Sequence, residues 1–230
     1  TGYTSAGGIS GYNYGFIENS ANVGDISARS ISKNQTNTRF INTVGGITGS
    51  SNGDVIRNVV NAGEVYSAGT RAGGIVGYHP KVTMTNISGH NDLTYSVNIG
   101  IVSGSDRPTL GAISGECKTE GTVEGNYYDV QILPLKAASN SDREGMNGVE
   151  TSALTSGKAL DGFDSNLWDF TAGQYPVLKQ FATEEKLAAA RKAVVAWPSG
   201  VNADDASKDA TLATVEGLAW SLKQGKVFTV

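Results

Sequence analysis

Apolar and polar positions recur in a fixed order along the first half of the chain. Three segments, 17–26, 56–65 and 84–93, begin with an aliphatic residue or Met and end with an aliphatic residue, and they carry Asn or Gly at the same positions between. The offsets between them are 39 and 28 residues. An internal repeat of this length is typical of a repeat architecture.

Each segment follows a Gly-Gly-Ile-x-Gly element, found at 7–11, 45–49 and 73–77. No apolar face with helical spacing persists through a copy, so short strands that turn at glycine are favoured over helices. The gapless offset of 28 residues suits one coil of a parallel β-helix. We therefore predict an all-β fold, a right-handed parallel β-helix (solenoid), with Ile9, Ile47 and Ile75 buried in one column.

The first asparagines of the three segments, Asn19, Asn58 and Asn86, occupy equivalent positions. Their amides are expected to hydrogen-bond to one another up the stack, as asparagine ladders do. The alternative is that they point outward and bind a sugar. Their spacing from the inward Ile17 favours the structural interpretation.

The repeat predicts three regions. Residues 1–128 are expected to form the β-helix, and residues 129–181 an aromatic-rich cap that closes its open end. The expected cap aromatics are Trp168, Phe170, Tyr175 and Phe181. Residues 182–230 are expected to be a small helical C-terminal segment, with a helix over 183–196 that ends before Pro198 and a strand at 227–230. The alternative is that this segment is part of a following domain.

The glycine-rich pattern resembles the GLUG motif of bacterial surface proteins, including adhesin-like proteins. The resemblance is carried by residues 8–17 and 74–78, less closely by 46–50, and by the closing segments 126–129, 168–170 and 175–178. It implies a parallel β-helix, an extracellular location on the cell surface or in the medium, and an unidentified host or bacterial surface ligand, either glycan or protein. His79-Pro80 departs from the motif and predicts an altered turn.

Composition narrows the range of partners. The 230 residues carry a net charge of −4 without a run of basic residues, which argues against nucleic acid binding. Cys117 is the sole cysteine, so neither an intramolecular disulfide nor a multi-cysteine metal site can form. The chain contains no stretch of ~18 apolar residues, so no membrane span is predicted in this segment. Because the chain opens without a charged and apolar leader, it is either a cytosolic protein or an excised mature segment, and a first residue, Thr1, other than Met favours the excised segment.

The same alignment places three carboxylates, Asp25, Glu64 and Asp92, in one outward column. Such a column can be a solvated acidic edge, a calcium site, or a catalytic pair of carboxylates. At the position before Asn19 and Asn58, Glu18 and Arg57 are expected to form an ion pair between neighbouring strands.

Tyr12 and Tyr78 are equivalent positions with Ser50 between them, and either pack at a strand end or stack on sugar rings. His79 and His90 have no second ligand at zinc-binding spacing, and no hydrolase or phosphate-loop motif occurs. We therefore expect no cofactor and no enzymatic activity, and interpret the chain as an adhesin-like or spacer module. The alternative is a carbohydrate-active enzyme or a calcium-dependent glycan-binding module that uses the acidic column.

Overall fold

The computed structural model describes residues 4–28, 42–52, 55–68, 71–81, 91–104, 109–138, 142–181, 194–196 and 227–229. Within these ranges helix is limited to α1 (Thr151–Leu154) and the short 3-10 turn η1 (Lys179–Phe181). Apart from these two short helical elements, the regular secondary structure of the described residues consists of strands. Nearly all strand pairs are parallel. The expected all-β class is confirmed.

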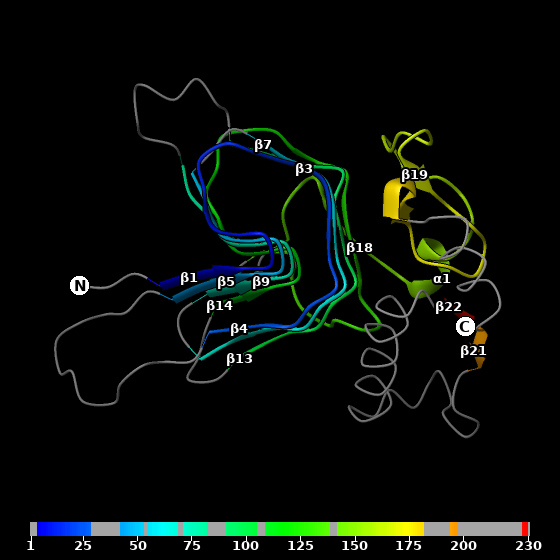
Figure 1. The fold of residues 1–230 in the computed structure, drawn as a ribbon, viewed down its shortest axis with the longest axis horizontal. Coiled ribbons are helices and arrows are strands. Elements are labelled where there is room, and N and C mark those ends of the chain that lie inside the picture. Colours follow the sequence, from blue (N-terminus) through cyan, green and yellow to red (C-terminus); the bar gives the residue numbers. More distant parts are fainter. Residues whose placement is uncertain are drawn as a thin grey trace, which may run out of the picture.

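Four parallel sheets, A to D, make up the main body (Figure 1). Sheet A contains β1 (Thr4–Gly7), β5 (Asn42–Gly45), β9 (Arg71–Gly73) and β14 (Thr109–Gly111). Sheet B contains β2 (Ser10–Asn13), β6 (Thr48–Ser51), β10 (Val76–His79) and β15 (Ser114–Cys117). Sheet C contains β3 (Phe16–Asn22), β7 (Val55–Asn61), β11 (Asp92–Thr94), β12 (Val97–Asn98), β16 (Val123–Glu124), β17 (Asn126–Asp129) and β18 (Met146–Val149). Sheet D contains β4 (Ile26–Ala28), β8 (Val65–Ser67) and β13 (Val102–Gly104).

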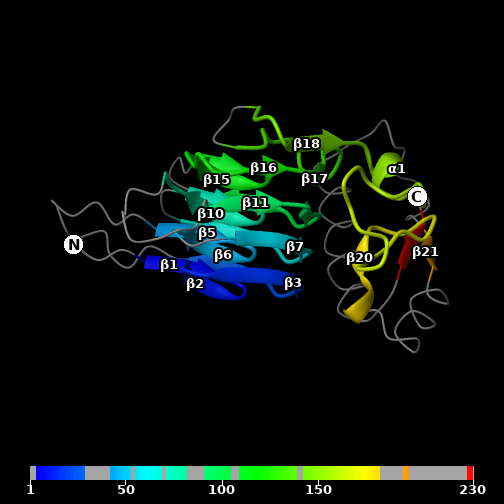
Figure 2. The same cartoon turned by 90° about the horizontal axis from the view of Figure 1, so that it is seen from above.

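The chain visits these sheets in the same order on each pass, and we call one pass a rung. Rung one is β1–β4, rung two β5–β8, rung three β9–β13 and rung four β14–β17. Each rung pairs parallel with the next, as the layers of Figure 2 show. Ile17 lies beside Ile56 and Ile26 beside Val65, so the expected pairing of the first two repeat segments is confirmed.

The third repeat segment does not pair as expected. Leu93 lies beside Ile56 and Val102 beside Val65, whereas the sequence alignment placed Leu93 beside Val65. Between rungs two and three the offset is 28 residues in sheet A and 37 in sheet C. The difference of nine residues enters between β10 and β11, after the unusual His79-Pro80. Asn86 lies outside the described residues.

The interior is a column of aliphatic side chains. Ile47, Ile75 and Ile113 are fully buried at equivalent positions, as expected for the first two. Ile9 is 45% exposed, so its expected burial was wrong: no described rung covers rung one on that side. Glycine is needed beside the column, because a Cβ on Gly46 would lie 2.2 Å from both Gly74 O and Asn61 Cγ.

The stack continues past residue 128. Gly111 and Ile113 repeat the Gly-Gly-Ile pattern with Ala112 in the second glycine position, a copy that the sequence analysis missed. Beyond it, β17 pairs with β18, and the Ile113 and Ser114 amides donate to Ala137 O. Side chains that close this end of the core include Leu133, Ala137, Ala138 and Met146.

The aromatics of 129–181 lie along the side of the stack rather than over its end. Trp168, Phe163 and Tyr175 form a second cluster with Val60 of rung two and Val97 of rung three. Val60 points outward from sheet C, because its neighbour Val59 points into the main core, and Val97 lies beside Val60 in the same sheet. Residues 150–181, including the antiparallel pair β19 (Trp168–Asp169) and β20 (Val177–Leu178), therefore cover the outer face of sheet C (Figure 2). We call them the side cover.

The helical segment expected within 182–230 lies mostly outside the described residues. The two stretches described there are strands, β21 (Val194–Ala196) and β22 (Val227–Thr229), which pair parallel. The strand expected at 227–230 is thus present, and residues 194–196 are strand where helix was expected. Among the described residues, no helix has the length and apolar character needed to cross a membrane.

Candidate functional site

The carboxylates of Asp25 and Glu64 lie on neighbouring rungs, one residue before β4 and β8. Asp25 Oδ1 accepts a hydrogen bond of 3.1 Å from the Glu64 backbone N–H, and Glu64 Oε1 accepts one of 3.3 Å from Ser103 Oγ. Each carboxylate is thus joined to the next rung. Their adjacency was expected, but they are engaged in holding rungs together.

Asp92 does not continue this column. It lies beside Val55 at the start of β11, and Ile101 is the residue beside Glu64, as the Val65 N–H donating to Ile101 O shows. The nine additional residues of rung three cause the displacement. Asp92 Oδ1 instead accepts a 2.6 Å hydrogen bond from the Thr122 backbone N–H. The predicted three-carboxylate column is therefore wrong.

The outer face of sheet B carries the candidate tyrosines. Tyr12, Ser50 and Tyr78 lie in register, as expected, and Glu116 follows them. The Arg71 guanidinium lies 4.3 Å above the ring of Tyr78 and also pairs with Glu116. Tyr78 is therefore held by neighbouring charges.

Glu116 receives two cations, from Arg71 and Lys118. Partial burial alone would raise its pKa, but the hydrogen bond from Lys118 and the charge of Arg71 hold the pKa below its usual range. At neutral pH this group is an ionised partner of two bases, which does not suit a general acid.

Tyr12 is the more open of the two tyrosines. Its ring stacks on that of Tyr14, with centroids 6.2 Å apart and planes 13° apart. Both side chains are exposed at the rung-one end of the stack.

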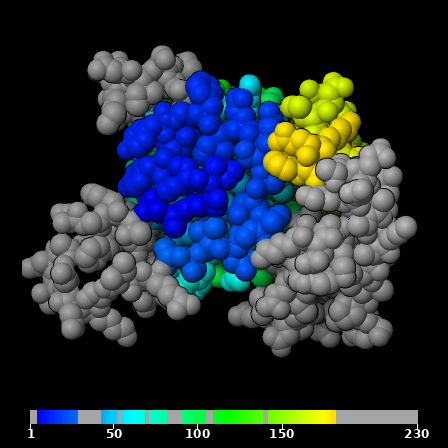
Figure 3. Space-filling view, in the orientation of Figure 1, coloured from blue at the N-terminus to red at the C-terminus, as the bar shows by residue number. Residues whose placement is uncertain are grey.

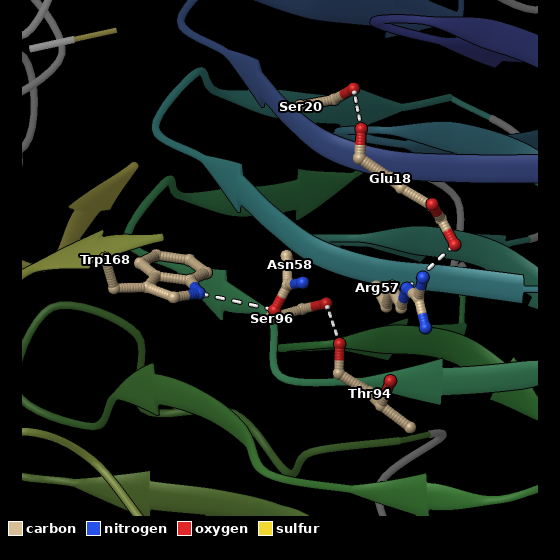
Figure 4. Close-up of polar contacts among 7 residues, drawn as sticks. All are labelled: Glu18, Ser20, Arg57, Asn58, Thr94, Ser96 and Trp168. Atoms are coloured by element: carbon tan, nitrogen blue, oxygen red, sulfur yellow. Dashed lines mark hydrogen bonds and ion pairs between the residues drawn. The ribbon is translucent and has the colours of Figure 1, made fainter. Parts of the chain in front are cut away.

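Asn19 and Asn58 are not members of a ladder. They have φ of 48° and 51°, and Tyr95 holds the same place in rung three with φ 51°. Asn tolerates this left-handed conformation better than most residues, so its role here is to turn the strand. Figure 4 shows Asn58 Oδ1 accepting a 3.3 Å hydrogen bond from Trp168 Nε1 of the side cover.

Glu18 and Arg57 form the expected ion pair, with 2.7 Å between Glu18 Oε1 and Arg57 Nε (Figure 4). The two residues lie side by side in β3 and β7. Because Arg57 is half exposed, the pair adds a few tenths of a kcal/mol at most, about what exposed pairs contribute.

The asparagine ladder is formed by the second Asn of the first two repeat segments and by Asn98 of rung three. Asn22 Nδ2 donates to Asn61 Oδ1, and Asn61 Nδ2 donates to Asn98 Oδ1, both at 2.8 Å. The same Nδ2 atoms also donate within their own rungs, to Gly24 O, Gly63 O and Gly100 O. All three side chains are buried. The predicted ladder is present, but it lies three residues after the predicted position in rungs one and two, and its third member is Asn98 rather than Asn86.

A buried polar corner contains His79 and Cys117, which lie side by side in β10 and β15. His79 Nδ1 is 3.7 Å from Cys117 Sγ, and His79 Nε2 has no hydrogen-bond partner. Burial lowers the pKa of His79 to about 4 and raises the pKa of the Cys117 thiol. Both groups are therefore neutral at pH 7, which leaves the thiol a poor nucleophile.

One further polar cluster joins rung four to the side cover. Asp129 Oδ2 accepts hydrogen bonds from Thr151 Oγ1 at 2.6 Å and from Tyr175 Oη at 2.5 Å. Burial, the Asp129 charge and its hydrogen bond raise the pKa of Tyr175 well above its usual value. The sequence analysis placed Asp129 at the end of the repeats but did not foresee this cluster, because its members are 22 and 46 residues apart.

Among the described residues, no group of three or more His, Cys, Asp or Glu side chains could hold a metal ion. Comparison of the chain with protein-family models, with curated proteins and with solved structures finds no match.

Proposed function

We propose that this chain is a non-catalytic module of a bacterial cell-surface or secreted protein. It is a right-handed parallel β-helix built from GLUG-type rungs, and it works as an adhesin-like or spacing element. The observation that supports this best is the use of its recurring polar side chains. The side chains of Asn22, Asn61 and Asn98 form hydrogen bonds that join one rung to the next.

The polar groups that could act as acids or bases support the same proposal. Asp25 and Glu64 accept hydrogen bonds from neighbouring rungs, and the Asp129 carboxylate is buried under Thr151 and Tyr175. A glycoside hydrolase needs two carboxyl groups facing a substrate across a gap of roughly 5–9 Å. The acidic column was the reason to consider such an enzyme or a calcium-dependent binder, and Ile101 interrupts it in rung three.

A spacer also benefits from this construction. Each rung lengthens the stack by about 4.8 Å, and the hydrogen bonds of four sheets resist bending. The side cover adds a second apolar cluster across rungs two and three, which stiffens the stack laterally.

The test is incubation of the purified protein with plant, mucin and bacterial polysaccharides, followed by assays for new reducing ends and unsaturated products. We expect no product above the buffer control. Turnover that disappears in Asp25→Asn or Glu64→Gln, and persists in the matched surface variant Asp164→Asn, would overturn the proposal. In parallel, beads coated with the protein should retain glycans or cells equally well with and without calcium.

A further inference from the structure

Four side chains meet where sheets A and B lie against each other in rungs three and four. Arg71 begins β9, Tyr78 lies in β10, and Glu116 lies beside Tyr78 in β15. Lys118 directly follows β15, and its backbone N–H donates to His79 O. Described strands pair with β9 and with β10 on both sides, so this place is inside the stack. We call the four side chains the Arg71 cluster.

Arg71 is held in one orientation from two directions. Its guanidinium carbon lies 4.3 Å from the centroid of the Tyr78 ring, and its Nε donates to Glu116 Oε2. Among the described residues, no acceptor is bonded to Arg71 Nη1 or Nη2. These two nitrogens form a planar fork of donors that matches the two oxygens of a carboxylate. The side chain keeps 19% exposure, so the fork is fixed in place and still reached by solvent.

The cluster carries an unbalanced positive charge. Lys118 Nζ also pairs with Glu116, so two cations share one carboxylate. Two positive charges and one negative charge leave a sum of +1, in a chain whose net charge is −4. One further carboxylate would neutralise the cluster.

The neighbouring charges do not cancel this excess. Arg143 donates from Nη1 and Nη2 to the backbone carbonyls on either side of Lys118, and so brings a third positive charge to the same stretch of chain. Lys81 and Glu120 pair with each other and are neutral together. The local field therefore attracts an anion.

The cluster lies away from the side cover. Sheet A begins on the side of the stack opposite the cover, as Figures 1 and 2 show. In Figure 3 the cover, in yellow, lies beside rung one, in blue, on one side only. Because Arg71 is the first residue of β9, the cluster belongs to the other side.

The row of side chains next to Arg71 favours a carboxylated sugar over an acidic peptide. Tyr12, Ser50 and Tyr78 lie in register along the stack, one to a rung and about 4.8 Å apart, so a linear ligand can follow them. Tyrosine combines an apolar ring with a hydroxyl group, as a sugar ring combines an apolar C–H face with hydroxyl groups. An acidic peptide would neutralise Arg71 but offers fewer partners to this row.

We propose that the Arg71 cluster binds the carboxylate of an acidic sugar, a uronic or a sialic acid, within a glycan that follows the row of Tyr12, Ser50 and Tyr78. Arg71 supplies a bidentate pair of hydrogen bonds, Lys118 supplies a second positive charge, and Tyr78 keeps the guanidinium in place. The inference rests on the adhesin-like form of the proposed function.

The test measures binding of labelled sugars to the full chain by fluorescence anisotropy. The acidic ligands are oligogalacturonate and sialyllactose, and each has a matched ligand without a free carboxylate, methyl-esterified oligogalacturonate and lactose. We expect saturable binding of at least one acidic ligand, and about tenfold weaker binding or less of its match, because the charge-assisted pair is lost. The ligand that binds distinguishes a uronic from a sialic acid.

Protein variants locate the site. Arg71→Lys keeps the charge and removes the fork, so binding should weaken about tenfold. Lys118→Gln changes a side chain that is 60% exposed, and should weaken binding severalfold without affecting the fold. Arg57→Lys is the matched control, because Arg57 also pairs through Nε with a glutamate, Glu18, but lies in sheet C. It should bind as the parent does. Circular dichroism checks folding, and Lys118→Gln and the matched ligands carry the test if Arg71→Lys does not fold.

Three results would overturn the inference: no saturable binding of either acidic sugar, equal binding of an acidic sugar and its match, or parent-like binding by both Arg71→Lys and Lys118→Gln. Oligoglutamate that binds as tightly as the acidic sugar would identify an acidic peptide as the partner, and the inference would again be wrong. None of these results bears on catalysis. A chain that binds no sugar and releases no product from polysaccharides remains a spacer, whereas released products contradict the proposed function itself.

Discussion

Asn61 makes inter-rung hydrogen bonds in both directions through one side chain. Its Oδ1 accepts from Asn22 of rung one, while its Nδ2 donates to Asn98 of rung three and to Gly63 O of its own rung. The side chain is fully buried, so water cannot replace these partners. A buried polar group without a partner costs about 1–3 kcal/mol. Replacement of a single ladder residue should therefore lower the free energy of unfolding about as much as replacement of a buried aliphatic residue.

We predict that Asn61→Ala lowers the free energy of unfolding by about 2–4 kcal/mol, because it leaves the amide of Asn22 and the carbonyl of Asn98 short of a partner and opens a cavity. Asn147→Ala, at an exposed position of β18, is the control and should change stability by less than about 0.5 kcal/mol. Urea unfolding followed by circular dichroism measures both. Equal effects would show that the ladder adds no stability.

His79 makes stability depend on pH. Its pKa is lowered from 6.5 to about 4 in the folded chain, chiefly by burial, with Arg143 lowering it further and Asp92 and Asn91 opposing. The unfolded chain therefore takes up a proton first as pH falls, so the contribution is fully present above pH 6.5 and is lost toward pH 4. Between pH 7 and 5 we expect a loss of about 2 kcal/mol.

Urea unfolding at pH 7, 6 and 5 measures this loss. A His79→Gln variant has no imidazole to protonate, so its stability should change much less over the same range. A parent protein whose stability is constant from pH 7 to 5 would contradict the buried, neutral state of His79.

At the scale of strands, backbone conformation explains why asparagine recurs at positions where its side chain does not join the ladder. Asn19, Asn58 and Tyr95 follow equivalent strand positions with φ near 50°. The sequence shows recurring asparagines but not their φ, and Asn suits both a ladder and a left-handed turn. From the sequence alone the first Asn was the predicted ladder residue, and only its φ in the structure distinguishes it from the second.

We predict that Asn19→Gly is neutral or stabilising, because glycine adopts φ of 48° without strain and Asn19 Oδ1 is buried without a partner. Asn19→Ala should cost about 1 kcal/mol, since alanine resists this conformation. Thermal unfolding of both variants gives the comparison. An alanine variant as stable as the glycine variant would contradict the left-handed assignment.

The rung architecture could be predicted because glycine and isoleucine recur at fixed spacing in sheets A and B. The register of rung three could not be, because a gapless alignment does not show that nine residues enter between β10 and β11. Leu93, Asn98 and Val102 do fit the repeat, but Tyr95 replaces the first Asn and hides the match. The prediction of the acidic column was wrong for this reason. The predicted register of Tyr12, Ser50 and Tyr78 was confirmed, because these residues precede the insertion.

At the scale of the whole molecule, two apolar clusters lie on opposite faces of sheet C. The inner one holds the rungs together, and the outer one binds the side cover through Trp168, Phe163 and Tyr175. Asp129 and Asn58 tie the same segment to the stack by hydrogen bonds. Because the inner cluster does not depend on the cover, the stack should persist when the cover is weakened.

We predict that Trp168→Ala costs about 3–5 kcal/mol of side-cover stability, as removal of buried aromatics does. Hydrogen exchange followed by mass spectrometry should show faster exchange in residues 150–181 and little change in sheets A and B. Leu167→Ala, at the exposed neighbour, is the control. Uniformly faster exchange throughout would mean that cover and stack unfold as one unit.

The central claim is that parallel rungs stack with rung three in the displaced register, and a pair of cysteines tests it most directly. Parallel neighbours lie about 4.8 Å apart, within disulfide range. In a Cys117→Ser background, Val55→Cys with Asp92→Cys should form a disulfide in the folded protein, as non-reducing mass spectrometry of peptides would show, because these residues lie side by side. Glu64→Cys with Asp92→Cys should not. A disulfide in the second variant and none in the first would contradict the stacking described for rungs two and three.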